Sequence, residues 1–253
     1  MFKHEHHRKL LSVLHRLRPE IVEACGLVFA GGTALAMEYG EYRLSRDLDF
    51  LAAGEGYRHA RGVLFDGGAR ALFRSTEAES VFSVGEARRD AYAIRFPIHI
   101  GPDTIKMEII HEARIALDEP RRLESLPVPL LTVEDQFAEK VLANADRGLD
   151  RALRSRVLID LGALGAHHEA PSFLSGLDKA TVVYPEAIAA LHRTLVAFNV
   201  SAYRAECFDA HRIDAVDRQV VETGLRRICA WSTWSSADFC RDASPTRCGP
   251  KSW

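Results

Sequence analysis

The sequence predicts an α+β protein in which a mixed or antiparallel sheet with flanking helices precedes a helical domain. Short apolar runs bounded by glycine alternate with helical periodicity as far as about residue 110. Two prolines then make residues 126–129 an extended connector, and helical periodicity continues to about residue 235. We therefore expect an α/β domain over residues 1–130 and a helical domain over 131–253, which ends in a loose tail from Ser235.

The first domain begins with apolar residues at three- and four-residue steps, which predict a helix over residues 5–24. Pro19 could instead begin a second, short helix inside that range. The elements expected next are a strand at 27–30, a helix at 33–39, a strand at 48–51, a loop at 52–56, a helix at 57–75, and strands at 91–98 and 104–110 joined by a turn.

In the second domain, Thr132 is the expected N-cap of a helix, with Asp135 as its acidic partner three residues on. Pro185 lies near the start of a later helix. Val221, Leu225 and Ile228 mark the buried face of the last one.

Composition is that of an ordinary globular protein. The 253 residues are 47% hydrophobic and 27% charged, with a net charge of −2. No whole-protein field attracts nucleic acid, so any such contact needs a local basic strip. Arginines at 151, 154 and 156 and at 226–227 are candidates, and nothing in the sequence ranks one above another.

The chain has no apolar run of about 18 residues and no signal-peptide core, so we expect a cytoplasmic protein without a membrane span. The odd number of cysteines, five, fits neither a disulfide framework nor a zinc site. Reduced, mostly buried thiols are therefore expected. The histidines at 4, 6 and 7 could suggest metal binding, but they lie in a charged terminal segment, and we do not assign them a metal role.

The acidic residues of one segment carry the strongest functional signal. Residues 43–50 read Arg-Leu-Ser-Arg-Asp-Leu-Asp-Phe, which places Asp47 and Asp49 on the same face of a strand. Two adjacent carboxylates repel each other unless cations neutralise them, and magnesium does this while keeping positions open for phosphate. A third acid is needed for two ions, and Glu108 is the candidate, with Lys106 on the same face.

A glycine turn precedes this acidic pair. Residues 31–35 read Gly-Gly-Thr-Ala-Leu between a strand and a helix. Without side chains, Gly31 and Gly32 let backbone N–H groups approach phosphate oxygens at a helix N-terminus. The Thr33 hydroxyl can donate to a phosphate or cap the helix.

Each of these features also has an ordinary structural interpretation. Gly-Gly can be only a turn, Asp-x-Asp can be solvated, Arg43 can be a surface residue and Glu108 an edge-strand charge. It is the order strand, Gly-Gly, helix, Asp-x-Asp, later strand acid that favours nucleotidyl or phosphoryl transfer.

These motifs resemble those of the AbiEii/AbiGii toxin-type nucleotidyltransferases, which belong to the DNA polymerase β-like superfamily. The resemblance covers residues 25–165 and is most specific at 31–50. It implies a polymerase-β-like mixed sheet, nucleotide binding by Gly31, Gly32, Thr33, Arg43 and Ser45, and metal binding by Asp47, Asp49 and Glu108. The cofactors implied are magnesium, as two ions, with a nucleoside triphosphate as substrate.

The resemblance continues into the helical domain. Residues 137–143 resemble the family helix with an essential lysine, which implies a catalytic and nucleotide-contacting role for Lys140. Lys140, Asn144 and Arg147 share one helix face, which without the family would indicate a solvated basic stripe. Residues 156–161 resemble a further motif in which Val157 replaces an aspartate, so Asp160 is a candidate structural partner of a basic residue.

Three functional hypotheses follow. The first is a magnesium-dependent nucleotidyltransferase that moves NMP from an NTP to an acceptor hydroxyl, by family analogy a tRNA 3′ end or other RNA, as the toxin partner of an antitoxin. The second is a catalytically silent nucleotide- or partner-binding member of the fold, because Glu108 and Val157 depart from the pattern. The third keeps the chemistry but modifies a protein hydroxyl.

Overall fold

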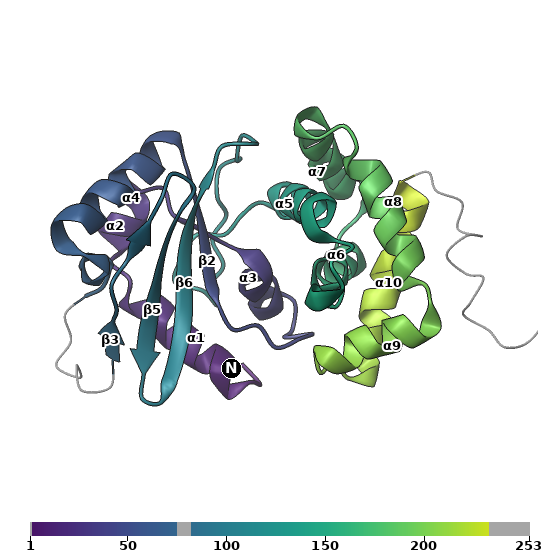
Figure 1. The fold of residues 1–253 in the computed structure, drawn as a ribbon, viewed down its shortest axis with the longest axis horizontal. Helices are drawn as coiled ribbons and strands as arrows, with labels where there is room; N and C mark the ends of the chain where they lie inside the picture. The colour runs from purple at the N-terminus through teal and green to yellow at the C-terminus, as the bar shows by residue number, and fades with distance from the viewer. Residues whose placement is uncertain (1, 75–81, 233–253) are drawn as a thin grey trace, which may run out of the picture. The chain divides into compact units, whose positions relative to one another are not determined.

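The computed structural model describes residues 2–74 and 82–232 (Figure 1). The chain divides into two compact units, Met1–Gln136 and Phe137–Trp253. The tail from Ser235, expected to be loose, lies outside the described residues, as do Trp234, Cys240 and Cys248.

The first unit is built on a six-stranded mixed sheet in the order β1-β2-β6-β5-β3, with β4 paired to β5. Strands β2 and β6 are parallel, and the other pairs are antiparallel. The strands are β1 Val28–Ala30, β2 Leu48–Ala53, β3 Phe82–Val84, β4 Arg88–Arg89, β5 Ala93–Ile100 and β6 Asp103–Glu112. The predicted α+β class with a mixed sheet is confirmed.

Helices of this unit cover the sheet and connect its strands. They are α1 Glu5–Arg16, α2 Pro19–Ala24, α3 Gly31–Glu38, α4 Gly54–Gly67 and the short 3-10 helix η1 Ala69–Leu72. In Figure 1, α3 lies beside β2, and α4 lies on the other side of the sheet.

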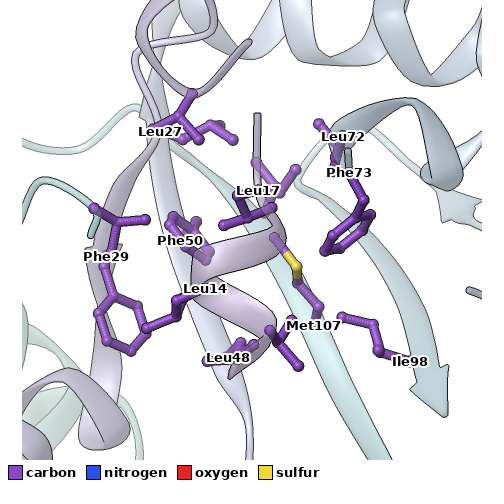
Figure 2. Packing of buried hydrophobic residues seen from close by; sticks show 14 of the residues in the cluster. Leu14, Leu17, Leu27, Phe29, Leu48, Phe50, Leu72, Phe73, Ile98 and Met107 are labelled. Carbon is purple, nitrogen blue, oxygen red and sulfur yellow. The ribbon is translucent and has the colours of Figure 1, made fainter. Parts of the chain in front are cut away.

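The main core lies on one face of the sheet. Alternation along the strands turns Phe29, Phe50, Met107 and Ile98 to this face, where all four are buried. Leu14 of α1 packs among them (Figure 2). The opposite face carries a smaller apolar cluster formed by Val28, Ala30, Leu51 and Leu131. The face with the main core therefore contributes most of the hydrophobic burial, and the opposite face, with its smaller apolar cluster, can carry charged side chains.

Several predicted boundaries differ from the structure. The segment 5–24 forms two helices because Pro19 starts α2 at its N1 position, where its missing N–H costs nothing. Helix α3 begins at Gly31 and not at residue 33. The loop predicted at 52–56 is wrong, since β2 continues to Ala53 and α4 begins at Gly54.

The second unit is helical. Helix α5 starts at the end of the first unit. The helices of the second unit are α5 Val133–Arg147, η2 Arg151–Leu153, α6 Arg156–His167, α7 Ala170–Val183, α8 Ala187–Phe198, α9 Ser201–Ala210 and α10 Ala215–Trp231. Thr132 Oγ1 accepts the Asp135 N–H at 3.2 Å, which confirms the predicted N-cap of α5.

Glycines bring α6 and α10 into close contact. A Cβ atom at Gly165 would lie 2.7 Å from the carbonyl oxygen of Gly224, and one at Gly224 would meet the Gly162 backbone. Val221, Leu225 and Ile228 are buried beside them, as predicted. Backbones can approach this closely only where no side chain lies between them, which explains the glycines. The sequence analysis did not predict this contact between α6 and α10.

Candidate functional site

The carboxylate of Asp49 lies against Gly31. Ala30 on β1 is the register partner of Asp49 on β2, and Gly31 follows at the start of α3 with φ +75°. A Cβ atom at Gly31 would lie 2.9 Å from Asp49 Cβ and closer still to its Oδ2. Only glycine fits here, because both the left-handed φ and the close approach exclude a side chain. Asp49 therefore lies at the N-terminus of a helix, where the helix dipole favours negative charge.

Charged residues continue from Asp49 across the sheet. Glu108 on β6 is the register partner of Asp49 and of Arg95 on β5. Glu108 Oε1 accepts a hydrogen bond from Arg95 Nε at 2.6 Å, and its Oε2 lies 3.0 Å from Lys106 Nζ. The structure thus places two of the three predicted acids side by side on adjacent parallel strands, on the face opposite the main core.

Asp47 precedes β2 and is half-buried. Its carbonyl oxygen accepts a hydrogen bond from Thr33 Oγ1 at 2.5 Å, and that hydroxyl also lies 2.8 Å from Ser45 Oγ. Thr33 is buried in α3. The two hydroxyls that were predicted to contact nucleotide therefore hold the segment before β2 against α3.

A further network fixes the same segment from the N-terminus. His7 of α1 is fully buried, and its Nδ1 lies 2.7 Å from Glu41 Oε1. The Ser45 N–H donates to His7 Nε2 at 3.1 Å. The backbone N–H groups of Lys3 and His4 donate to the Glu41 carboxylate. A neutral His7 with its proton on Nδ1 donates to Glu41 and accepts the Ser45 N–H, and its Nε2 also lies 3.2 Å from the Ser45 carbonyl oxygen.

The electrostatics of this network agree with a neutral imidazole. Burial lowers the pKa of His7 more strongly than the Glu41 contact raises it. Burial alone would raise the pKa of Glu41, but hydrogen bonds from the His4 and Lys3 amides and from His7 outweigh it and lower that pKa. Sequence reasoning missed both residues. The available signal was Glu41 itself, an acid directly after the helix-ending Gly40.

Arg43 is also buried, with 3% of its surface exposed, so its interpretation as a surface residue is wrong. Its Nη1 donates to the Leu44 carbonyl oxygen at 3.3 Å, and its guanidinium lies 5.9 Å from the Tyr42 ring centroid. Arg43 is therefore a buried guanidinium in the segment that leads to Asp47.

In the helical unit, Lys140 forms an ion pair with Asp160. Lys140 Nζ on α5 lies 2.8 Å from Asp160 Oδ2 on α6, and both residues are largely buried. Asp160 is thus the structural partner of a basic residue, as predicted. The solvated stripe is wrong for Lys140 and for Asn144, which is buried, whereas Arg147 is exposed.

The residues present fit magnesium in part. In residues 2–74 and 82–232, no group of three His, Cys, Asp or Glu side chains is arranged to hold a metal ion. Asp47 and Asp49 are half-buried, and the Asp49 carboxylate lies at a helix N-terminus; magnesium commonly takes one or two carboxylates together with substrate phosphates. Glu108 instead contacts two cations, with which a metal ion would compete.

Two other predictions concern the described residues. Cys25, Cys207 and Cys229 are buried and form no disulfide, as expected for reduced thiols. No helix in the described ranges is long and apolar enough to cross a membrane.

The mixed sheet with its flanking helices is a nucleotidyltransferase-type α+β fold. A protein from H. pylori, described as a proposed nucleotidyltransferase, superposes with a TM-score of 0.51 at 18% identity, over 89% of this chain and 91% of its own. JHP933 from Helicobacter pylori has a TM-score of 0.44 at 17% identity, over 91% of this chain and 97% of its own. An antigenic nucleotidyltransferase-like protein from Paracoccidioides brasiliensis has a TM-score of 0.41 at 13% identity, over 76% of this chain and 94% of its own.

The family described as "Nucleotidyl transferase AbiEii toxin, Type IV TA system" matches residues 12–215. The chain belongs to this family. The comparison with curated proteins gives no match. The structural similarity at 18% identity shows the shared fold and carries no statement about substrate.

Proposed function

We propose that the protein transfers a nucleotide monophosphate from an NTP to an acceptor hydroxyl, with RNA as the acceptor class and magnesium as the cofactor. The observation that carries this proposal is the contact of the Asp49 carboxylate with Gly31 at the start of α3. It brings an acid, a side-chain-free turn and a helix N-terminus to one place, which suits a metal-bound triphosphate.

Each residue has a proposed role. The N–H groups of Gly31 and Gly32 bind phosphate oxygens, and Asp47 and Asp49 hold the metal. Bound magnesium would neutralise the phosphate charge as the leaving pyrophosphate forms. Glu108 is held in place by Arg95 and Lys106, next to Asp49. We propose that Glu108 either serves as the third metal ligand or accepts the proton of the acceptor hydroxyl. Arg43, Thr33 and Ser45 hold the segment that carries Asp47, and Lys140 contacts the nucleotide.

The reaction joins the acceptor oxygen to the α-phosphorus and breaks the bond between that phosphorus and the bridging oxygen of pyrophosphate. The acceptor proton passes to Glu108 or to water. Orienting the two reactants accounts for much of the rate, because the protein needs to supply no covalent chemistry of its own.

The test is transfer of label from each α-labelled NTP to an RNA pool by the wild type, by Asp49→Asn and by Glu108→Gln. We expect the wild type to label RNA with magnesium and not with EDTA, and Asp49→Asn to lose at least about 100-fold, the order lost with an essential electrostatic contact. Asp66→Asn, on the exposed side of α4, is the matched control and should label normally. Equal labelling by Asp49→Asn would refute the role of that residue. Label on protein and not on RNA would move the acceptor to a protein hydroxyl.

A second candidate is a nucleotide-binding protein without transferase activity. Two observations favour it: Glu108 is ion-paired with Arg95 and Lys106, and Lys140 with Asp160. Magnesium-dependent NTP binding, with no labelling over any RNA or protein pool, would support it against the first proposal.

The toxin role rests on the family alone. We propose that expression arrests growth and that a cognate antitoxin relieves the arrest. Growth arrest by Asp49→Asn as strong as that by the wild type would contradict a catalytic toxin.

A further inference from the structure

A basic and aromatic surface on α4 and β4 has no place in the proposed active site. We call it the Arg–Phe surface, and its five residues line a hollow of about 480 Å³. They are Arg58, Arg61, Gly62 and Phe65 of α4 and Arg89 of β4. A second hollow of about 410 Å³ shares Phe65 and Arg89 and continues toward Arg70.

Local structure explains why these side chains gather. Residues 58, 61, 62 and 65 follow three- and four-residue steps and so share one face of α4. Arg89 reaches the same place from the neighbouring strand, where its Nη1 donates to the Leu64 carbonyl oxygen at 2.8 Å. Its guanidinium lies 5.6 Å from the Phe65 ring centroid. The arginine is therefore held beside the ring.

The charges of this surface are only partly neutralised. Arg58 pairs with Glu55, an exposed pair of small energetic weight. In the described part of the chain no carboxylate pairs with Arg61 or Arg89. By contrast, Arg154 pairs with Glu206, and Arg227 pairs with Glu169. One arginine in each basic run of the sequence is thus paired, whereas Arg61 and Arg89 have no carboxylate partner in the described residues and line the same hollow as the exposed ring of Phe65.

Phe65 and Gly62 are unexplained by the fold. Phe65 exposes 78% of its surface, although burying its ring would stabilise the protein. Gly62 lies inside a helix without a positive φ, and a Cβ atom there would meet nothing within 4 Å. A glycine weakens a helix interior, so its effect here is to keep the hollow beside Phe65 open.

We propose that the Arg–Phe surface binds single-stranded RNA, with an unpaired base stacked on Phe65 and phosphates on Arg61, Arg89 and Arg58. Exposed aromatic rings beside arginines are what base stacking and backbone neutralisation need. Helix α4 covers the core face of the sheet, whereas Asp49 and Glu108 lie on the other face. This is therefore a second RNA site, distinct from the acceptor site of the proposed function, and it does not depend on turnover.

The experiment measures binding of a labelled, unstructured 12-nucleotide RNA by fluorescence anisotropy, with EDTA and without NTP, over a salt series. Phe65→Ala should weaken binding about tenfold, which is the scale of one base stack. Arg61→Ala should weaken binding and reduce the salt slope by about 0.7, which is one phosphate contact. Gly62→Met, a good helix former that fills the hollow, should weaken binding while the protein stays folded.

Tyr92→Ala and Arg226→Ala are the matched controls, an equally exposed tyrosine and an exposed arginine of α10. Both should bind RNA as the wild type does. All five substitutions are at exposed positions, and thermal midpoints no lower than that of the wild type verify folding.

Inorganic polyphosphate separates stacking from charge, because it has phosphates and no bases. Phe65→Ala should bind polyphosphate as the wild type does, whereas Arg61→Ala should bind it less tightly. RNA binding by Phe65→Ala equal to the wild type would overturn the proposal. So would polyglutamate binding that matches RNA and responds to the same three variants, since the surface would then suit an acidic protein. RNA binding without labelling would count against the proposed transferase and leave this site intact.

Discussion

At the scale of single residues, the site depends on the approach of Gly31 to Asp49. A backbone with φ +75° and a carboxylate under its Cα leave no room for any other residue. The same turn also starts the helix whose N–H groups face the proposed phosphates. Gly31 therefore determines both the backbone conformation of the turn and the position of the Asp49 carboxylate.

We expect Gly31→Ala to cost about 1–2 kcal/mol of unfolding free energy for its left-handed backbone and to lower transfer about 100-fold, because Asp49 must move. Gly40→Ala is the control, with φ +77° and nothing within 4 Å of its Cβ atom. It should lose about 1–2 kcal/mol for its left-handed backbone, without the added cost of a clash, and leave transfer unchanged. Urea unfolding and NTP labelling measure the two effects, and equal labelling by both variants would contradict the contact.

The buried His7 predicts a pH dependence of stability. Its folded-state pKa lies below its ordinary value of 6.5, so below pH 6.5 the unfolded chain takes up a proton that the folded protein does not. The free energy of unfolding should therefore fall between pH 7.5 and 5.5, by at most about 1.4 kcal/mol per pH unit for this group.

His7→Asn should flatten that fall, whereas His15→Asn, at an exposed position of α1, should leave it as it is. His192, whose pKa burial also lowers, contributes with the same sign in every variant. Chemical unfolding at several pH values measures the slope. A slope for His7→Asn equal to that of the wild type would show that His7 titrates alike in both states.

At the scale of elements, the Lys140–Asp160 pair joins α5 to α6. Because both groups are largely buried, Lys140→Ala and Asp160→Ala should each cost about 3–5 kcal/mol, which is the penalty of one buried charge left unpaired. The double variant Lys140→Ala/Asp160→Ala should cost less than the sum of the two single losses. Arg58→Ala, from the exposed pair with Glu55, should cost under about 1 kcal/mol.

Urea unfolding of the four variants tests this, and additive losses would contradict the pairing. The result bears directly on catalysis. A Lys140 variant that fails to label RNA is informative about nucleotide contact only at temperatures where its fold persists.

At the scale of the whole molecule, substrate binding should stabilise the protein. An NTP at 100 times its dissociation constant adds about 2.7 kcal/mol, or about 5–10 °C in thermal midpoint for a chain of this size. We expect this shift for the wild type with magnesium and not with EDTA. Asp47→Asn and Asp49→Asn should show no shift under either condition. A full shift in EDTA would show that nucleotide binds without the metal.

Much of the fold was predictable because its signals are local. Glycine punctuation and strand alternation located β1, α3, β2, β5 and β6. Glu108 was predicted to join Asp49 as a third acid, whereas the register that pairs them is seen only in the structure. The short strands β3 and β4 were missed, since two or three residues carry too little periodicity. Contacts between distant segments were missed as well. His7 reaches Glu41 across 34 residues, and Gly162 meets Gly224 across 62, and no local pattern records either contact.

The link between the first residues and Glu41 has a practical consequence for preparing the protein. The N–H groups of Lys3 and His4 and the ring of His7 together hold the carboxylate whose loop leads to Asp47. Trimming or proteolysis of these few residues would leave both the sheet and the acidic motif in the chain, yet remove the attachment of that loop. An inactive sample should therefore first be checked by mass for the presence of Lys3, His4 and His7.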